Sequence, residues 1–97
     1  MNIVAITACP TGIAHTYMAA EKLAITAKAL GHTIKVETQG AMGIENRLSS
    51  ADIAAADVVL FAVDVAVEDE ERFEGRRIVR VPIHEALKNP QAVFSCL

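Results

Sequence analysis

The 97-residue sequence predicts an α/β fold: a four-stranded parallel open sheet with helices on both faces, a three-layer sandwich of the flavodoxin-like or Rossmann-like kind. Three observations predict it. Residues 2–8 and 57–63 are almost continuously apolar, as strands buried on both faces are. Segments with helical periodicity alternate with the expected strands. The hydrophobic fraction of 53% is sufficient for one core, so we expect residues 1–97 to form a single domain.

The first half of the chain predicts a strand, a long helix and a second strand. After residues 2–8, a helix of about four turns is expected from near His15 to Leu30. Its apolar residues recur at intervals of three and four, and Gly31 is expected to end it. Residues 32–38 alternate polar and apolar side chains, which favours a half-exposed strand at the edge of the sheet.

The second half predicts shorter elements. Ser49 is expected to cap a short helix that ends near Ala56, since a serine with an acidic first turn is typical of a helix start. The charged run at residues 68–74 is typical of a solvated face. The other expected features are a break at 39–43, a buried strand at 57–63, a fourth strand at 77–83, and a terminal helix over 84–96 interrupted at Asn89-Pro90.

Composition excludes several function classes. The net charge is −3, and the chain has no Trp, one Tyr and three Phe, so neither nucleic acid nor an anionic membrane is an expected partner. No apolar run approaches the ~20 residues that span a bilayer, and the N-terminus does not resemble a signal peptide, so we expect a cytoplasmic protein. Cys9 and Cys96 form no zinc pattern, and we expect no metal ion and no cofactor.

Cys9 directly follows the first strand and precedes the long helix. In open parallel sheets, ligands bind at the carboxyl ends of the strands, at the topological switch point. A helix N-terminus binds anions through its unpaired N–H groups and its dipole. The same environment favours the thiolate, which is the nucleophilic form of cysteine. The sequence therefore predicts a catalytic Cys9 that accepts a phosphoryl group.

The expected phosphate ligands are backbone N–H groups of the loop after Cys9. Pro10 has no N–H, whereas the six residues after it each supply one. The Thr16 hydroxyl is a further donor to the sulfur, and whether the His15 side chain also contacts phosphate is open. These expected phosphate-binding residues are Thr11, Gly12, Ile13, Ala14, His15 and Thr16.

The spacing from Cys9 to His15 and Thr16 matches the Cys-x5-Arg-Ser/Thr loop of cysteine phosphatases, except that the arginine is missing. Arginine binds phosphate bidentately and stabilises the transition state of hydrolysis. Without it, the loop is expected to hold a thiophosphate without readily hydrolysing it. A low-molecular-weight cysteine phosphatase or reductase, and a module that only senses phosphorylation, remain alternatives to a phosphoryl carrier.

The chain resembles the fructose-type enzyme IIB, the phosphocysteine component of the bacterial phosphoenolpyruvate-dependent sugar phosphotransferase system. The resemblance covers essentially the whole chain and shows no departure in the phosphate loop. Its first block is the segment Cys9-Pro10-Thr11-Gly12-Ile13-Ala14-His15-Thr16-Tyr17-Met18-Ala19-Ala20-Glu21. The later blocks are Gly31, Val36-Glu37-Thr38-Gln39-Gly40, Gly43, Ile53, Ala56-Asp57, Ala66-Val67-Glu68 and Glu71-Arg72-Phe73.

The resemblance implies a phosphotransferase. A phosphohistidine on enzyme IIA is expected to donate to Cys9, which passes the phosphoryl group to a fructose-like hexose transported by the membrane enzyme IIC. Contact with IIC implies a place at the inner face of the membrane, and sugar selection belongs to IIC. Near the site, we expect plain structural roles for Gln39 in a turn and for Asp64 after the third strand.

Overall fold

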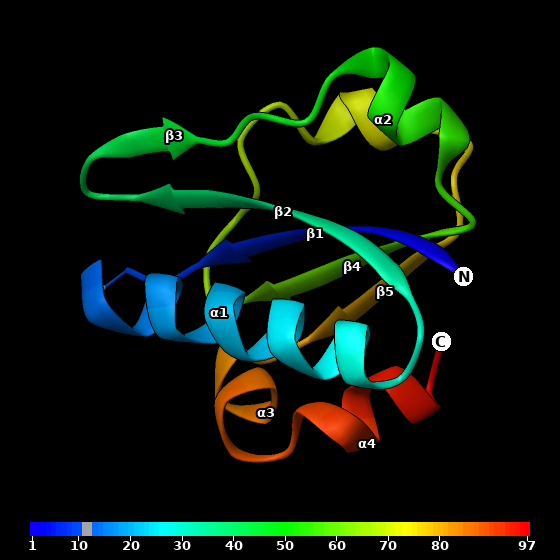
Figure 1. The fold of residues 1–97 in the computed structure, drawn as a ribbon. Helices are drawn as coiled ribbons and strands as arrows, with labels where there is room; N and C mark the ends of the chain where they lie inside the picture. The colour runs from blue at the N-terminus through cyan, green and yellow to red at the C-terminus, as the bar shows by residue number, and fades with distance from the viewer. Residues whose placement is uncertain (11–12) are drawn as a thin grey trace.

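A five-stranded sheet forms the centre of the computed structural model, which describes residues 1–10 and 13–97 (Figure 1). The strand order is β3-β2-β1-β4-β5, and all neighbours are parallel except β2 and β3. The predicted α/β class with an open sheet is confirmed, but the sheet has five strands instead of the expected four, because the short antiparallel β3 is added beside β2. The strands are β1 (Asn2–Ala8), β2 (Thr33–Gly40), β3 (Gly43–Glu45), β4 (Val58–Val63) and β5 (Ile78–Val81).

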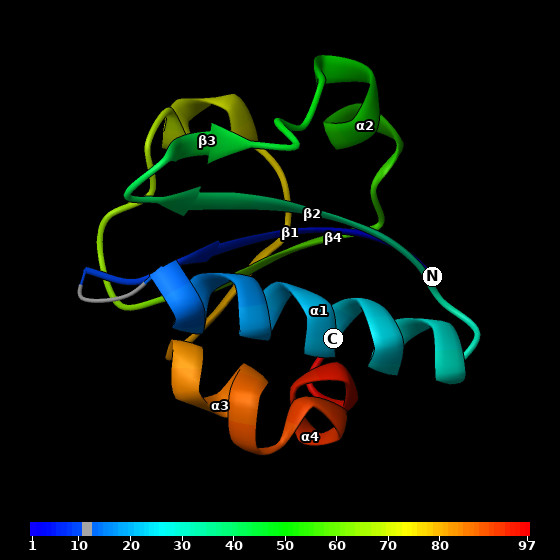
Figure 2. The same cartoon turned by 60° about the vertical axis from the view of Figure 1, so that its left-hand side comes forward.

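Helices cover both faces of the sheet (Figure 2). Helices α1 (Ile13–Ala29), α3 (Ile83–Lys88) and α4 (Pro90–Ser95) lie on one face, while α2 (Ser50–Ala55) and the 3-10 helix η1 (Glu70–Phe73) lie on the other. Successive strand residues point to opposite faces, so each central strand contributes to two cores. Ile3, Ala5, Val58, Leu60 and Ala62 pack under α1, whereas Val4, Ile6, Val59 and Phe61 pack under α2 and η1.

The helix limits follow the expected signals closely. Helix α1 ends before Gly31, whose φ of 81° is easiest for a residue without a side chain. Ser49 caps α2 in a capping box with Asp52. Hydrogen bonds lower the pKa of Asp52 to about 2, with the largest effect from Lys35 and smaller effects from Ser49. The terminal helix is broken as predicted, with Asn89 between α3 and α4.

The predicted strand over residues 32–38 is confirmed, and its first part lies at the edge of the sheet as expected. Strand β2 continues to Gly40, and its last residues, 38–40, pair on the outer side with the short antiparallel β3, which occupies part of the expected break. Its first half is exposed or half-buried, but Glu37, Thr38 and Gln39 are buried. Alternating polar and apolar residues predict that the polar side chains face solvent. Polar side chains that are buried against one another give the same alternation, so the pattern does not reveal their burial.

Candidate functional site

Cys9 lies at the topological switch point of the sheet. From β1 the chain moves to β2 on one side and later to β4 on the other, so β1 has a parallel neighbour on each side. The end of β4 is fixed to the end of β1 by a 3.0 Å hydrogen bond from the Asp64 N–H to the Ala8 carbonyl. Cys9, the next residue, is half-buried. The structure therefore places Cys9 where open parallel sheets bind ligands.

The first turn of α1 is anchored against the end of β1. The Thr7 hydroxyl donates to the Thr16 carbonyl oxygen at 3.0 Å, and both threonine side chains are fully buried. This contact brings the N-terminal end of a 17-residue helix next to the strand that precedes Cys9 (Figure 1). The N–H groups and the positive dipole end of that turn are suited to an anion.

The expected phosphate ligands are only partly described. Thr11 and Gly12 lie outside the described residues, and Ile13 begins α1. Ala14 and His15 are exposed in the first turn, and Thr16 is buried. These positions bring the backbone of residues 13–16 to the same end of the sheet as Cys9. Their contacts with phosphate stay a prediction.

A small cavity of about 90 Å³ adjoins the strand end that precedes Cys9. One wall is the sheet, through Ala8 and Gly40, and the other is the loop after β4. A Cβ built on Gly40 would lie 3.9 Å from Cγ2 of Thr16, so the end of β2 also borders the start of α1. The ends of β1 and β2, the loop after β4 and the start of α1 therefore lie at the same edge of the sheet. The loop residues that line the cavity are Val65, Ala66 and Glu68.

Asp64 has a structural contact, in agreement with the role expected for it. Its Oδ1 accepts a 3.1 Å hydrogen bond from the Ile83 N–H, where α3 begins. This contact ties the end of β4 to the helix layer under α1. The carboxylate is thus engaged in holding the loop after β4.

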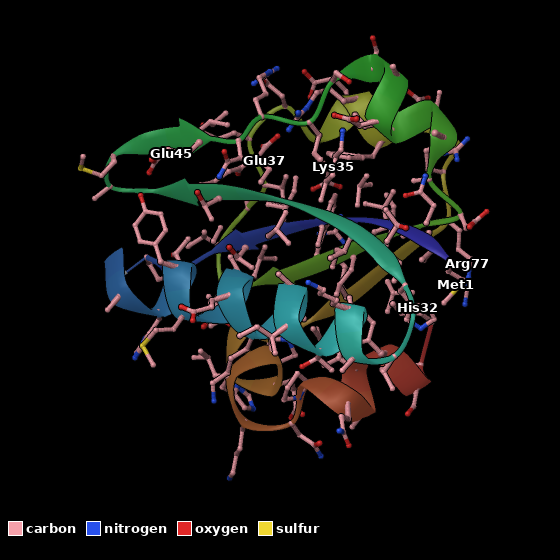
Figure 3. All side chains as sticks on the ribbon, in the orientation of Figure 1. Met1, His32, Lys35, Glu37, Glu45 and Arg77 are labelled. Atoms are coloured by element: carbon pink, nitrogen blue, oxygen red, sulfur yellow. The ribbon has the colours of Figure 1, made fainter. Side chains whose placement is uncertain are left out.

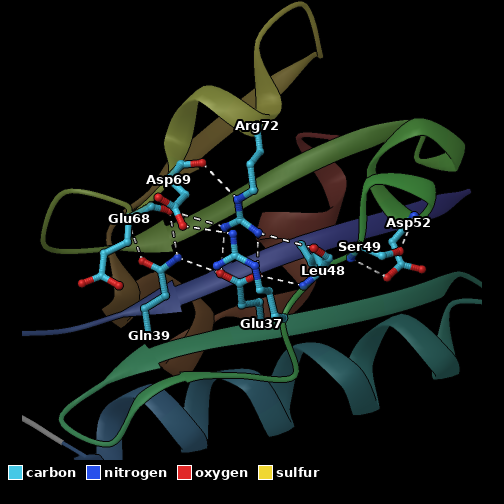
Figure 4. Close-up of polar contacts among 9 residues, drawn as sticks. Glu37, Gln39, Leu48, Ser49, Asp52, Glu68, Asp69 and Arg72 are labelled. Carbon is cyan, nitrogen blue, oxygen red and sulfur yellow. Dashed lines mark hydrogen bonds and ion pairs between the residues drawn. The ribbon is translucent and has the colours of Figure 1, made fainter.

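Glu37, Gln39 and Arg72 form a buried polar network that sequence reasoning missed (Figure 4). Gln39 is only 8% exposed and lies within β2, so the expectation of a plain turn residue is wrong. Arg72 belongs to the charged run at residues 68–74, yet its guanidinium binds the fully buried Glu37 carboxylate at 3.0 and 2.9 Å. The sequence signals for this pair are a glutamate in an otherwise strand-like segment and the presence of both residues in blocks that match the enzyme IIB family.

The network keeps Glu37 ionised. Burial raises the pKa of Glu37, but hydrogen bonds from Arg72, Gln39 and the Leu48 N–H together outweigh it, so the pKa lies below its ordinary value. Lys35 and Glu37 both project from β2 toward the layer of α2 and η1 (Figure 3). The same face of β2 thus carries Gln39 to the edge of the cavity.

Within the described ranges 1–10 and 13–97, no helix has both the length and the apolar character needed to cross a membrane.

Comparisons with known proteins agree with this arrangement. The family model for the PTS system lactose/cellobiose specific IIB subunit matches residues 4–95. The chain is 54% identical over 94 residues to the PTS system fructose-like EIIB component 2 of Escherichia coli K12, covering 97% of this chain and 89% of that protein. It is also 56% identical to the fructose-like PTS system EIIBC component of the same organism, covering 98% of this chain and 20% of that longer protein.

A solved structure has the same fold. The domain from the fructose-specific IIABC component of the PTS system of Borrelia burgdorferi superimposes with a TM-score of 0.91 at 49% identity, covering 96% of this chain and 88% of the domain. The family model names lactose and cellobiose, whereas these relatives are named for fructose. What the names share is the IIB component. With a match over residues 4–95 and more than half of its residues identical to those of a full-length relative, the chain belongs to the phosphotransferase-system IIB family and is a fructose-like IIB phosphotransferase component.

Proposed function

We propose that Cys9 carries the phosphoryl group in sugar uptake. The observation that supports this most is the position of Cys9, at the switch point and beside the first turn of α1. The Cys9 sulfur attacks the phosphorus of a phosphohistidine on enzyme IIA, so that an S–P bond forms as the P–N bond breaks. A hydroxyl of a fructose-like hexose then attacks the phosphorus, the S–P bond breaks, and the thiolate is regenerated as the hydroxyl loses its proton.

The partners follow from the domain organisation of relatives. One relative is named as a joined IIBC component, and the solved Borrelia domain comes from a IIABC component. In this proposal residues 1–97 act as one IIB domain, with enzyme IIA as donor and sugar-loaded membrane enzyme IIC as acceptor. The protein then works in the cytoplasm, against the inner face of the membrane.

The loop chemistry favours transfer over hydrolysis. No arginine is present between Cys9 and Thr16, so the loop lacks the bidentate guanidinium that a cysteine phosphatase uses on its phosphoryl intermediate. Backbone N–H groups at a helix start bind phosphate without supplying that stabilisation. A long-lived phosphocysteine suits a carrier that must wait for its acceptor.

The test is phosphoryl uptake by the purified protein. On incubation with phosphorylated enzyme IIA, the protein is expected to gain the mass of one phosphoryl group, and peptide mapping should place it on Cys9. The product should persist in buffer and disappear when IIC membranes and fructose are added. Absence of the mass gain, or rapid turnover of p-nitrophenyl phosphate by the protein alone, would contradict the carrier function.

Met42 is expected to belong to the surface that docks enzyme IIA. It is 71% exposed in the turn between β2 and β3, beside the glycines that line the small cavity. Met42→Glu places a charge where an apolar contact is expected and should raise the apparent KM for phosphorylated IIA about tenfold, equivalent to about 1.4 kcal/mol of binding energy.

The matched control is Ile25→Glu. Ile25 is 61% exposed on α1, twelve residues after the helix begins and so about 18 Å along its axis. This variant should leave the KM unchanged. Equal KM values for Met42→Glu and the wild type would remove Met42 from the docking surface.

A further inference from the structure

The loop between β4 and η1 forms one wall of the cavity at the end of β1, and the side chains of Gln39 and Arg72 hold its backbone. Arg72 Nη2 donates to the Glu68 carbonyl at 3.4 Å, and Gln39 bonds both polar groups of Glu68. The Glu68 N–H donates to Gln39 Oε1 at 2.8 Å, and Gln39 Nε2 donates to the Glu68 carbonyl at 3.3 Å. Gln39 therefore forms hydrogen bonds with both the N–H and the carbonyl of Glu68, as the backbone of a neighbouring strand would. Both residues line the cavity.

Glu37 dictates which way the Gln39 amide points. An ionised carboxylate only accepts hydrogen bonds, so the Gln39 group 2.7 Å from Glu37 Oε2 must be the Nε2 donor. Oε1 is then left facing the Glu68 N–H, which needs an acceptor. The two contacts of Gln39 with Glu68 are thus formed only in one amide orientation (Figure 4).

Arg72 completes the arrangement from the other end of the loop. It binds Glu37 through both terminal nitrogens and donates through Nε to the Asp69 carbonyl at 3.0 Å. The guanidinium fork keeps Glu37 ionised and fixes its plane. Arg72, Glu37 and Gln39 therefore form a continuous series of contacts that runs from η1 through β2 to Glu68.

We propose that Gln39 is a positioning residue for phosphoryl transfer at Cys9, a role that rests on the proposed function. Gln39 holds the Val65–Glu68 backbone at a fixed distance from the end of β1, and Glu37 with Arg72 holds Gln39. The wall so formed orients the phosphoryl donor or acceptor over the sulfur. Gln39 does not touch the sulfur in this role, and the reactivity of the thiol itself comes from the start of α1.

The test is Gln39→Met, which keeps the length of the side chain and removes its polar atoms. The rate of transfer from saturating phosphorylated IIA should fall about tenfold to 100-fold, the scale on which misplacing a reacting group by about 1 Å is felt. The rate of Cys9 alkylation by iodoacetamide, measured with Cys96 replaced by serine, should stay at the wild-type value. A merely structural role would change stability and leave the saturated transfer rate of the folded protein unchanged.

The matched control is Lys35→Met, on the same strand and the same face. It removes the 2.6 Å ion pair with Asp52, away from the cavity, and should leave transfer unchanged. Wild-type transfer rates in folded Gln39→Met would overturn the proposal. If the wild type itself is not phosphorylated at Cys9, the proposed function fails instead, and the two failures are distinct.

Hydrogen exchange of the wild type tests the proposal without any variant. The Glu68 amide lies outside the helices and strands, yet its bond to Gln39 should protect it strongly from exchange. The amide of Gly75, which lies in an exposed turn, supplies an internal reference. Exchange of Glu68 at the rate of an unstructured peptide would overturn the proposal even if Gln39→Met does not fold.

Discussion

Cys9→Ser is expected to abolish phosphoryl uptake from phosphorylated enzyme IIA while the fold survives. A serine hydroxyl is not ionised at neutral pH, whereas a thiolate at a helix start is an effective nucleophile. Cys9 is half-buried after β1 and is replaced by a residue of similar size, so packing should change little. The measurement is intact mass after incubation with the phosphorylated donor, with circular dichroism to show folding.

Cys96→Ser is the matched control. Cys96 is exposed after α4, at the far end of the chain from the candidate site. Its replacement should leave both the extent and the rate of phosphorylation unchanged. Near-normal phosphoryl transfer to sugar by Cys9→Ser would show that the nucleophile lies elsewhere.

Most of the fold was predictable because its signals are local. The continuous apolar runs of β1 and β4, each short and rich in β-branched residues, are typical of strands buried on both faces. Gly31, Ser49 and Asn89-Pro90 mark helix ends through their own backbone preferences. The place of Cys9 at the switch point then followed from strand order, which the connection rules restrict strongly.

What was missed depends on contacts between distant residues. Glu37 and Arg72 are 35 positions apart, and each alone has the pattern of a solvated charge. The sequence predicts a turn at Gln39 because nothing local indicates that β3 pairs with the end of β2. Burial of polar groups is decided by their partners, and a single sequence does not identify those partners.

Arg72→Met is expected to cost about 3–5 kcal/mol of unfolding free energy, the usual effect of removing one member of a buried ion pair. Glu37 is fully buried and would keep its carboxylate, with the donors from Gln39 and Leu48 but without the guanidinium that binds both its oxygens. A loss of this size is a large part of the ~5–15 kcal/mol that holds a small domain folded. Urea unfolding at neutral pH measures it.

Two control variants separate the buried charge from the loss of an arginine. Arg47→Met removes a 3.0 Å pair with Asp69 in which both side chains are about half exposed, and should change stability by no more than about 0.5 kcal/mol. Glu37→Met combined with Arg72→Met removes both charges and should recover much of the loss. Recovery should be incomplete, because the Leu48 N–H and the Gln39 amide lose their acceptor.

The contribution of Glu37 to the free energy of unfolding should depend on pH in the opposite direction in Arg72→Met and in the wild type. In the wild type the pKa of Glu37 is lowered by folding, so its contribution is fully present above its unfolded value of about 4.5 and is lost as pH falls through the folded value. In Arg72→Met, the effect of burial on Glu37 is no longer outweighed by the guanidinium, so the pKa of Glu37 in the folded protein should rise above its unfolded value. The buried Glu37 carboxylate then lowers the free energy of unfolding most at neutral pH, and protonation of Glu37 removes this cost as the pH falls. The stability gap between the two proteins should therefore narrow from pH 7 to about pH 5. A gap that stays constant over this range would show that Glu37 is not the charge left uncompensated, and that Arg72 stabilises the fold through its packing alone.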